Sequence, residues 1–457
     1  MKALYDKVSI IADKSTAGRT PTIYVPPLLL KKWKLTDSTR ISLQVGSKQI
    51  DVFVSIHQDN LAQIKIPGNV LQLLALPNRS FFVQIGFCPL SSRLSIGPIL
   101  ALLTHHTPSE TNGFGEMEVF FREMYRFCCM NGFLFFVIPL QTLVEPKELT
   151  GYLPNDEGWE SMSLPIPDVV YNRIHSRKLE NSESFHRFST LLNEAAIPFF
   201  NGSFLSKWDT HELLLTEDSL APYLPETILF QSEVEFVTFL QSHTEVFVKP
   251  AFGSQGRNIC KLSRVSEGWV LEHSSNIQDT HLIETEERLY RTLMKNTKKR
   301  SYIVQRGIPL LDIDGHKTDF RVLLNKNKKQ EWTITSIVAR LGNAGHIVSN
   351  LAQGGEMKNA AAFLSSVFER TEAIRIYKSL SSLALNVAKT VESKRDDLFG
   401  ELGIDLALDS DNHPWIIEVN SKPSKKFHAD SDKIRPSVKS IVEYMNTLYV
   451  SKGPSSI

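Results

Sequence analysis

Alternation of apolar and polar residues near the end of the chain predicts a β-hairpin. Within residues 403–408 every second position is aliphatic, which turns Asp405 away from the aliphatic face of the strand. Glu418 and Asn420 lie two residues apart on the next strand and therefore share a face. The polar run 409–412 between the strands is typical of a hairpin loop. If Asp405 pairs with Glu418, their Cβ atoms lie about 4.5–5.5 Å apart.

These three oxygen-bearing side chains form a candidate metal site. Carboxylate and amide oxygens without His or Cys suit Mg²⁺ or Mn²⁺ better than zinc. A half-buried hairpin whose acids face water is the alternative. The apolar neighbours weigh against it, because a buried pair of carboxylates without a counter-cation is costly. We therefore predict Asp405, Glu418 and Asn420 as metal ligands, and Asp409 and Asp411 as turn residues.

The first hundred residues repeat one pattern. A strand ending in Pro, a short helical turn and a strand ending in Gly occupy residues 23–46, and the same order returns at 64–86. Two copies of a unit that cannot bury its apolar face alone should close on each other. The arrangement resembles small pseudo-twofold β-barrels of the double-psi kind. We expect a scaffold or a docking module for other proteins there, without chemistry of its own.

The pattern after residue 93, together with the N-terminal repeat, predicts an α/β (α+β) protein with three domains. A helix is expected over 116–130, followed by a continuous apolar strand at 133–138 and a strand-like segment at 168–171. From residue 204 the chain changes to short strands, glycine loops and helices. We place the domains at 1–93 for the duplicated barrel, 94–203 for a mixed α/β unit and 204–457 for the last domain.

Basic residues gather in four places. Arg173 and Arg177, in the segment 172–178, follow a strand and suit an anionic substrate group, although a solvated basic loop is equally compatible with the spacing. The runs 295–300 and 326–329 are typical of solvated helix ends and hairpin turns. The run 422–426, which contains Lys422, Lys425 and Lys426, directly follows the metal strand, so we consider attraction of an acidic substrate or product there.

Composition and charge limit the classes of partner and the compartment that we expect for this chain. The chain has 457 residues and a net charge of +1, which gives no electrostatic reason to expect nucleic acid or an anionic membrane as a partner. Its four cysteines lack metal spacing and read as small buried residues of a reducing compartment. The start has no signal-peptide core, and the apolar stretch 127–140 is broken by Asn131 and Gly132. We expect a cytoplasmic protein.

A lysine and a glycine loop predict phosphate binding. An apolar strand delivers Lys249, and Gly253 and Gly256 follow, where backbone N–H groups can approach phosphate oxygens because no Cβ intervenes. The loop is neither a P-loop nor a dinucleotide-binding fingerprint, and a hairpin turn also needs glycines. The prediction of phosphate binding is strengthened by the order of the elements that follow the loop. These are strands at 302–308, 319–324 and 333–340, a polar glycine turn at 349–355 and a helix at 370–393.

Residues 204–449 resemble the ATP-grasp superfamily, and the whole chain resembles the YheC/YheD family of endospore coat-associated ATP-grasp proteins. The resemblance rests on the segments YNRIHSRK, VKPAFGSQGRNI, DFRVLL and WIIEVNSKPSKK. It implies a C-terminal ATP-grasp fold preceded by a pre-ATP-grasp-like unit. It also implies ATP as a substrate and Mg²⁺, or Mn²⁺, as the cofactor.

The resemblance gives each matching residue a role in nucleotide binding. Lys207 and Lys249 would contact the α- and β-phosphates, the Gln305 carbonyl and the Ile308 N–H would read the adenine edge, and Asp312 would bind the ribose. The loop expected to fold over the phosphates consists of Gly253, Ser254, Gln255 and Gly256. Gln305 stands where many relatives have Glu, which a backbone contact to adenine tolerates.

Further roles concern the metal and the reaction. Asp405, Glu418 and Asn420 would hold the magnesium ions that bridge the β- and γ-phosphates. Three residues would face the transferred phosphate and the acyl intermediate, namely Arg321, Arg340 and Asn350. Gly403 stands where some members carry an arginine, so Arg321 or Arg340 would have to supply the charge for the oxyanion.

The implied activity is that of an ADP-forming carboxylate–amine ligase. ATP would phosphorylate a carboxylate to an acyl phosphate, and an amine of an amino acid or peptide would then displace phosphate. The expected setting is spore envelope or coat formation, in the mother cell or on the spore, with a peptide or coat protein among the candidate substrates. Two other functions stay open, a nucleotide-binding structural coat protein without turnover and a kinase-like transfer to a small hydroxyl.

Overall fold

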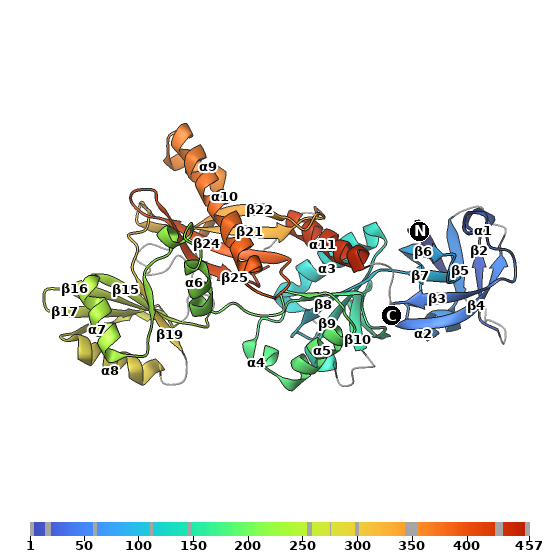
Figure 1. Cartoon of the computed structure of the whole chain (residues 1–457), viewed down its shortest axis with the longest axis horizontal. Helices are drawn as coiled ribbons and strands as arrows, with labels where there is room; N and C mark the ends of the chain where they lie inside the picture. Colours follow the sequence, from blue (N-terminus) through green and yellow to red (C-terminus); the bar gives the residue numbers. More distant parts are fainter. Residues whose placement is uncertain are drawn as a thin grey trace.

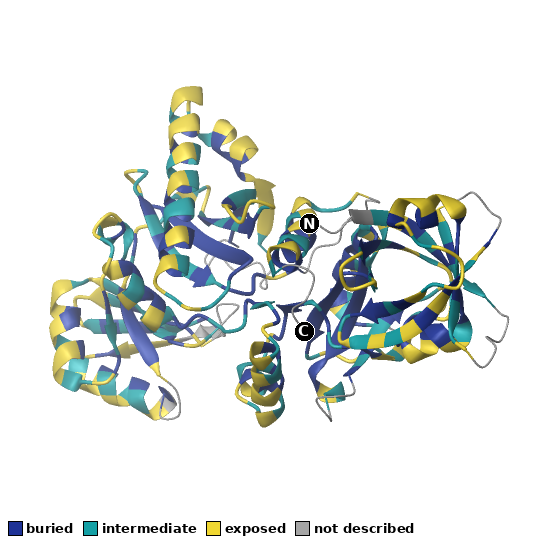
Figure 2. Ribbon diagram, turned by 45° about the vertical axis from the view of Figure 1, so that its right-hand side comes forward, coloured by how far each residue is buried: buried dark blue, intermediate teal, exposed yellow. Residues whose placement is uncertain are grey.

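The computed structural model describes residues 4–13, 20–57, 62–109, 113–143, 149–253, 258–274, 276–297, 301–342, 355–425 and 433–452. Figure 1 shows a barrel at one end of the molecule, a mixed sheet with its helices in the middle, and two further sheets at the other end. Strands are buried along the centre of each part, while the helices expose their outer faces (Figure 2). The predicted mixed α/β class is confirmed.

The N-terminal barrel is built by the predicted repeat. Its elements are β1 (Leu4–Asp13), β2 (Thr22–Val25), α1 (Pro27–Trp33), β3 (Arg40–Val45), β4 (Lys48–Ile56), β5 (Gln63–Pro67), α2 (Gly68–Leu73), β6 (Phe81–Cys88) and β7 (Arg93–Ile96). The order β2-α1-β3 returns as β5-α2-β6, and the strands close in the order β1-β5-β2-β4-β3-β7-β6. Alternate residues of the strands point into one core, so the two copies bury their apolar faces against each other, as predicted.

A six-stranded sheet forms the middle of the molecule. Its elements are β8 (Ile99–Thr104), η1 (Gly115–Met117), α3 (Glu118–Asn131), β9 (Leu134–Pro139), η2 (Leu140–Thr142), β10 (Leu149–Pro154), β11 (Trp159–Leu164), β12 (Val169–Asn172), α4 (Arg177–Glu180), α5 (Glu183–Glu194) and β13 (Phe199–Phe200). The order is β11-β10-β9-β8-β12-β13, with β9, β8, β12 and β13 parallel. The carboxyl ends of these parallel strands therefore meet at one edge, where the segment 172–178 begins.

The two sheets at the other end carry the nucleotide and metal candidates. Helix α6 (Lys207–Leu215) and η3 (Ala221–Tyr223) precede the first sheet in the chain but pack in the core of the second, through Leu214 and Tyr223 and through Leu220 between them. The first sheet and its helices comprise β14 (Thr227–Leu229), α7 (Glu233–Ser242), β15 (Glu245–Pro250), β16 (Cys260–Val265), β17 (Gly268–His273), β18 (Asn276–Ile283), α8 (Glu286–Thr297) and β19 (Tyr302–Arg306). Its strands are antiparallel in the order β14-β19-β15-β16-β17-β18. Helices α7 and α8 pack on this sheet through their own core, which includes Phe236 and Leu289.

The second sheet follows directly in the sequence. Its elements are β20 (Asp312–Ile313), β21 (His316–Lys326), β22 (Trp332–Leu341), β23 (Glu356–Asn359), α9 (Ala360–Val367), α10 (Arg370–Ser393), β24 (Glu401–Leu408), β25 (Pro414–Asn420) and α11 (Pro436–Lys452). The strand order is β23-β22-β21-β24-β25, with β20 paired to β21. The long helix predicted at 370–393 is α10, and its apolar stripe packs on this sheet.

The C-terminal helix α11 returns to the middle of the molecule. Its residues Val438, Ile441 and Met445 share a core with α3 and with β8 of the middle sheet. Figure 1 shows α11 lying beside α3. Strand β7 pairs with β3 and β6 and so belongs to the barrel sheet beyond residue 93. The domain division at 93 and 203 stays a prediction. Among the described helices, none is both long and apolar enough to cross a membrane.

Candidate nucleotide and metal site

The predicted hairpin places its oxygen-bearing side chains on two paired strands. Strand β24 is buried at every position, and its register pairs Asp405 with Glu418 and Gly403 with Asn420. The predicted pairing is therefore confirmed. A register irregularity next to Asp405 accommodates the extra residue on β25, Ile417. Asp405 is almost fully buried, while the Glu418 side chain keeps 23% of its surface exposed.

Two arginines hold the Asp405 carboxylate. Arg321 lies opposite Asp405 on β21 and donates to both carboxylate oxygens, through Nε to Oδ1 and through a terminal nitrogen to Oδ2 at 2.9 Å. Arg340 on β22 lies 3.2 Å from Asp405 Oδ2 and also donates to Asp319, at 2.5 and 2.8 Å. Burial alone would raise the pKa of Asp405, but the two guanidinium groups outweigh it and lower the pKa. Asp405 is therefore ionised at neutral pH.

Lys207 connects Glu418 with the beginning of the glycine loop. It is the first residue of α6, whose start is capped by Ser206. The Lys207 ammonium donates to Glu418 Oε1 at 2.8 Å and to the carbonyl of Gly253 at 2.8 Å. The start of α6, strand β25 and the beginning of the glycine loop thus meet at the Lys207 ammonium group.

Lys249 reaches the same region from β15. Its ammonium donates to Gln305 Oε1 at 2.7 Å, and the Gln305 amide nitrogen donates in turn to the Thr227 hydroxyl at 3.0 Å. Burial and then the charge of Lys207 lower the pKa of Lys249 to about 8, against the opposing pull of Glu418. The two lysines and Glu418 are therefore electrostatically coupled across the two C-terminal sheets.

The other predicted residues are placed as follows. Ile308 is buried just after β19, and Gln305 lies within that strand, where its side chain is the partner of Lys249. The Asp312 carboxylate accepts the N–H of Gly315 at 2.8 Å and so stabilises a tight turn. Four predicted residues, Ser254, Gln255, Gly256 and Asn350, lie outside the described residues.

The donor set fits a hard divalent cation. Two carboxylates and one amide on neighbouring strand positions match the oxygen ligands that Mg²⁺ and Mn²⁺ prefer. Within the part of the chain that the structure describes, no group of three or more His, Cys, Asp and Glu side chains has the geometry of a metal site. A magnesium ion here would accordingly need further oxygens from water or from the phosphates of its nucleotide.

Comparison with known proteins assigns the chain to a family. The model described as YheC/D like ATP-grasp matches residues 196–448, more than half of the 457 residues. The chain belongs to the YheC/D-like ATP-grasp family. It is 29% identical over 388 residues to the endospore coat-associated protein YheD of Bacillus subtilis (strain 168), covering 84% of each chain.

Two more similarities are of lower sequence identity. The endospore coat-associated protein YheC of Bacillus subtilis (strain 168) is 24% identical over 269 residues, which cover 59% of this chain and 74% of that protein. Among solved structures, D-alanyl-alanine synthetase A from Vibrio cholerae covers 78% of this chain and 97% of its own, with 13% identity and a TM-score of 0.44.

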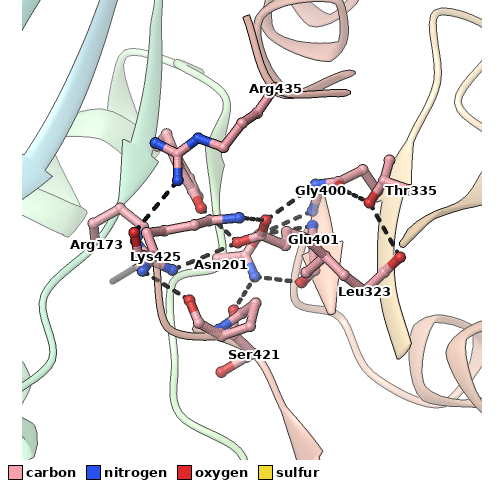
Figure 3. A network of polar contacts seen from close by, with 12 residues as sticks. Arg173, Asn201, Leu323, Thr335, Gly400, Glu401, Ser421, Lys425 and Arg435 are labelled. Carbon is pink, nitrogen blue, oxygen red and sulfur yellow. Dashed lines mark hydrogen bonds and ion pairs between the residues drawn. The ribbon is translucent and has the colours of Figure 1, made fainter. Parts of the chain in front are cut away.

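This YheC/D-like chain also contains a buried charge network that the sequence did not predict. The carboxylate of Glu401, at the start of β24, accepts hydrogen bonds from Tyr171 at 2.8 Å and Asn325 at 3.2 Å. It also forms ion pairs with Lys425 and, at 3.5 Å, with Arg173. Figure 3 shows Arg173, Lys425 and Asn201 around Glu401. Both cations outweigh burial and lower the pKa of Glu401.

The network corrects two interpretations of the basic segments. Arg173 is 1% exposed, so the solvated-loop alternative for its segment is wrong at this residue. Lys422 and Lys425 are buried with Glu180 and Glu401 as partners, so neither is available to attract an acidic substrate. Lys426 lies outside the described residues, so the prediction for it stays open. The available signal was that the apolar strand GELGIDLAL contains two acidic residues, Glu401 and Asp405, because a buried charge requires a partner.

Pro423, in the same basic segment, explains why this chain has glycine at position 403, where some family members carry an arginine. A Cβ atom there would lie 2.8 Å from Pro423 Cβ, which is closer than side chains tolerate. Pro423 is held by Arg173, which donates to its carbonyl at 2.9 Å. An arginine at position 403 would therefore displace the segment 421–423, which follows the end of β25.

Nucleotide affinity of this ATP-grasp chain is expected to fall as the pH rises through about 8, where Lys249 loses its proton. If only the ammonium form binds phosphate, the loss approaches about tenfold for each pH unit above the pKa. Gln305→Glu places a carboxylate beside Lys249, which raises the pKa of Lys249. The fall of nucleotide affinity should therefore move to higher pH. Titration with ATP at pH 7–10 measures the fall of affinity in the unsubstituted protein and its shift in Gln305→Glu. Substitution of the exposed Gln330 by Glu is the matched control. The same pH dependence of ATP affinity in Gln305→Glu and Gln330→Glu would contradict the role of Lys249.

Proposed function

We propose that this chain is an ADP-forming ligase, which activates a carboxylate as an acyl phosphate with Mg²⁺ and ATP and joins it to an amine. The observation that carries the proposal is that Lys207 binds both Glu418 and the Gly253 carbonyl, while Lys249 extends from β15, the strand that leads to Gly253. Two lysines from separate elements beside a carboxylate pair provide both a phosphate cradle and a metal site. Membership of the ATP-grasp family supports this reading of the geometry.

The protein contributes positions and charges to such a reaction. Lys207 and Lys249 hold the phosphates of ATP. Asp405, Glu418 and Asn420 would hold a Mg²⁺ ion, which would supply further positive charge against the phosphates. Lys207 exchanges Glu418 for phosphate when the nucleotide arrives. Arg321 keeps Asp405 ionised and oriented. Positioning and charge neutralisation supply most of the catalysis in phosphoryl transfer.

The setting follows from the relatives. The matched Bacillus subtilis proteins are named as endospore coat-associated. We infer a substrate in spore envelope or coat formation, either an amino acid or a peptide. The barrel, built from a duplicated unit whose described residues form an apolar core, serves as a docking module for such a partner.

A structural role without turnover is the second candidate, because both oxygens of Asp405 already have arginine partners. A protein that only binds a nucleotide needs no exchange of these partners. The two candidates differ in their products, not in ATP binding.

Hydroxylamine trapping distinguishes them. The protein is incubated with ATP, Mg²⁺, hydroxylamine and pools of amino acids, peptides and spore-coat extract. The ligase proposal expects hydroxamate and ADP in equal amounts, because hydroxylamine intercepts the acyl phosphate. ATP binding without hydroxamate or ADP in any pool favours the structural role, and a phosphorylated hydroxyl product would indicate kinase-like transfer.

A further inference from the structure

Arg177 of the middle part reaches the candidate nucleotide site. It follows β12 as the first residue of α4, and its guanidinium carbon lies 3.9 Å from the ring centroid of Phe252 and 5.1 Å from that of Phe204. A terminal nitrogen donates to the carbonyl of Leu205 at 3.4 Å. Phe252 precedes Gly253, whose carbonyl binds Lys207. Arg177 therefore packs against both segments that position Lys207.

Within the described part of the chain, no carboxylate forms an ion pair with Arg177. One of its terminal nitrogens is buried and has no hydrogen-bond partner among those residues. Burial lowers the pKa of Arg177 to about 10, while the charges of Glu418 and Asp209 act in the opposite direction. The side chain stays protonated at neutral pH. A half-buried cation without a partner is costly, and a bound anion removes that cost.

The other arginines of the site are already engaged. Arg321 and Arg340 both bind Asp405, and Arg340 also binds Asp319. Lys207 has Glu418 as its partner, and Lys249 has Gln305. Arg177 is the arginine near Glu418 whose guanidinium has no acidic partner among the described residues.

We propose that Arg177 binds the terminal phosphoryl group of ATP, so that the middle part of the chain completes a site otherwise built by the two C-terminal sheets. This inference rests on the proposed nucleotide site. The planar guanidinium stacked on Phe252 is held in one orientation, which suits bidentate binding of phosphoryl oxygens. The segment 172–178, for which the sequence indicated an anion, thus divides into a buried anchor at Arg173 and a ligand-binding residue at Arg177.

Comparison of ATP and ADP affinities tests the proposal without knowledge of the acyl substrate. Arg177→Gln is expected to weaken Mg²⁺-dependent binding of ATP by about tenfold to a hundredfold, the range for a lost charge-assisted hydrogen bond, and of ADP by less than about threefold. Arg177→Lys, which keeps the charge but loses the planar fork, should give an intermediate loss. Arg187→Gln on α5 is the matched control, because Arg187 is 60% exposed and pairs with Glu183.

The outcomes separate a ligand from a packing role. Phe252→Leu removes the stacking partner but not the cation, so it is expected to weaken ATP binding more than ADP binding, by less than Arg177→Gln does. Equal losses for ATP and ADP in Arg177→Gln, or no loss for either, would overturn the proposal. If Arg177→Gln does not fold, the ATP-to-ADP affinity ratio of Arg177→Lys decides in the same way. Failure of the unsubstituted protein to bind either nucleotide would instead refute the proposed function.

Discussion

Glu401→Ala is expected to lower the free energy of unfolding by about 3–5 kcal/mol, the cost of leaving buried charges unpaired. The carboxylate is fully buried, and Arg173 and Lys425, which are also buried, would lose their common counter-ion. Tyr171 would lose its hydrogen-bond acceptor as well. Tyr171 and Arg173 lie at or just after the end of β12 in the middle sheet, while Glu401 and Lys425 lie at the start of β24 and after β25 in the second C-terminal sheet. The substitution should therefore weaken the contact between these two sheets. Denaturant unfolding followed by tryptophan fluorescence measures the effect.

An exposed ion pair provides the control. Arg40 and Asp51 of the barrel form an ion pair with side-chain exposures of 67% and 50%, so Asp51→Ala should cost less than about 1 kcal/mol. The Glu401→Ala transition should move to lower denaturant concentration, while that of Asp51→Ala stays near the transition of the unsubstituted protein. Equal shifts in the two variants would show that the Glu401 network does not hold the two parts together.

Glu418→Gln is expected to reduce ADP formation by about a hundredfold to a thousandfold, the usual cost of removing one group that stabilises developing charge. The amide preserves the shape of the side chain but weakens a metal ligand and leaves Lys207 without its anionic partner. The rate is measured as ADP released under the conditions that give hydroxamate with the unsubstituted protein.

Asp409→Asn is the matched control on the same hairpin. The Asp409 carboxylate accepts hydrogen bonds from backbone N–H groups of the turn and from Trp415 at 2.9 Å, and no ion pair of it is among the contacts described. Its rate should stay within a few-fold of the unsubstituted protein. A similar loss in both variants would mean that the hairpin needs its acids for structure alone.

The sequence predicted the elements of this protein well. Alternation along 403–408 and the spacing of Glu418 and Asn420 predicted the two strands and the faces of their polar side chains. The pairing of Asp405 with Glu418 was only a condition of that prediction, because it depends on the register irregularity between Asp405 and Leu406, without which Asp405 would lie opposite Ile417. The duplicated barrel was predictable because each copy repeats its strands and helix in order.

Long-range charge pairing was not predictable. Arg173 and Glu401 lie 228 residues apart, and nothing in their local sequence indicates that they meet. Lys422 and Lys425 read as an exposed basic run because sequence spacing contains no information about which surface the next segment covers. The engagement of Asp405 by Arg321 and Arg340 depends on the order of β22, β21 and β24 in the sheet, which the spacing along the chain does not determine.

The central claim is that Asp405, Glu418 and Asn420 hold a metal ion that connects the protein to ATP. The most direct test is ATP affinity, measured calorimetrically with saturating Mg²⁺ and with EDTA, for the unsubstituted protein and for Asp405→Asn. The proposed site predicts that Mg²⁺ strengthens ATP binding by at least about tenfold, or 1.4 kcal/mol, in the unsubstituted protein. Asp405→Asn should lose that increment but keep the affinity seen in EDTA. The same Mg²⁺ increment in both proteins would contradict the claim.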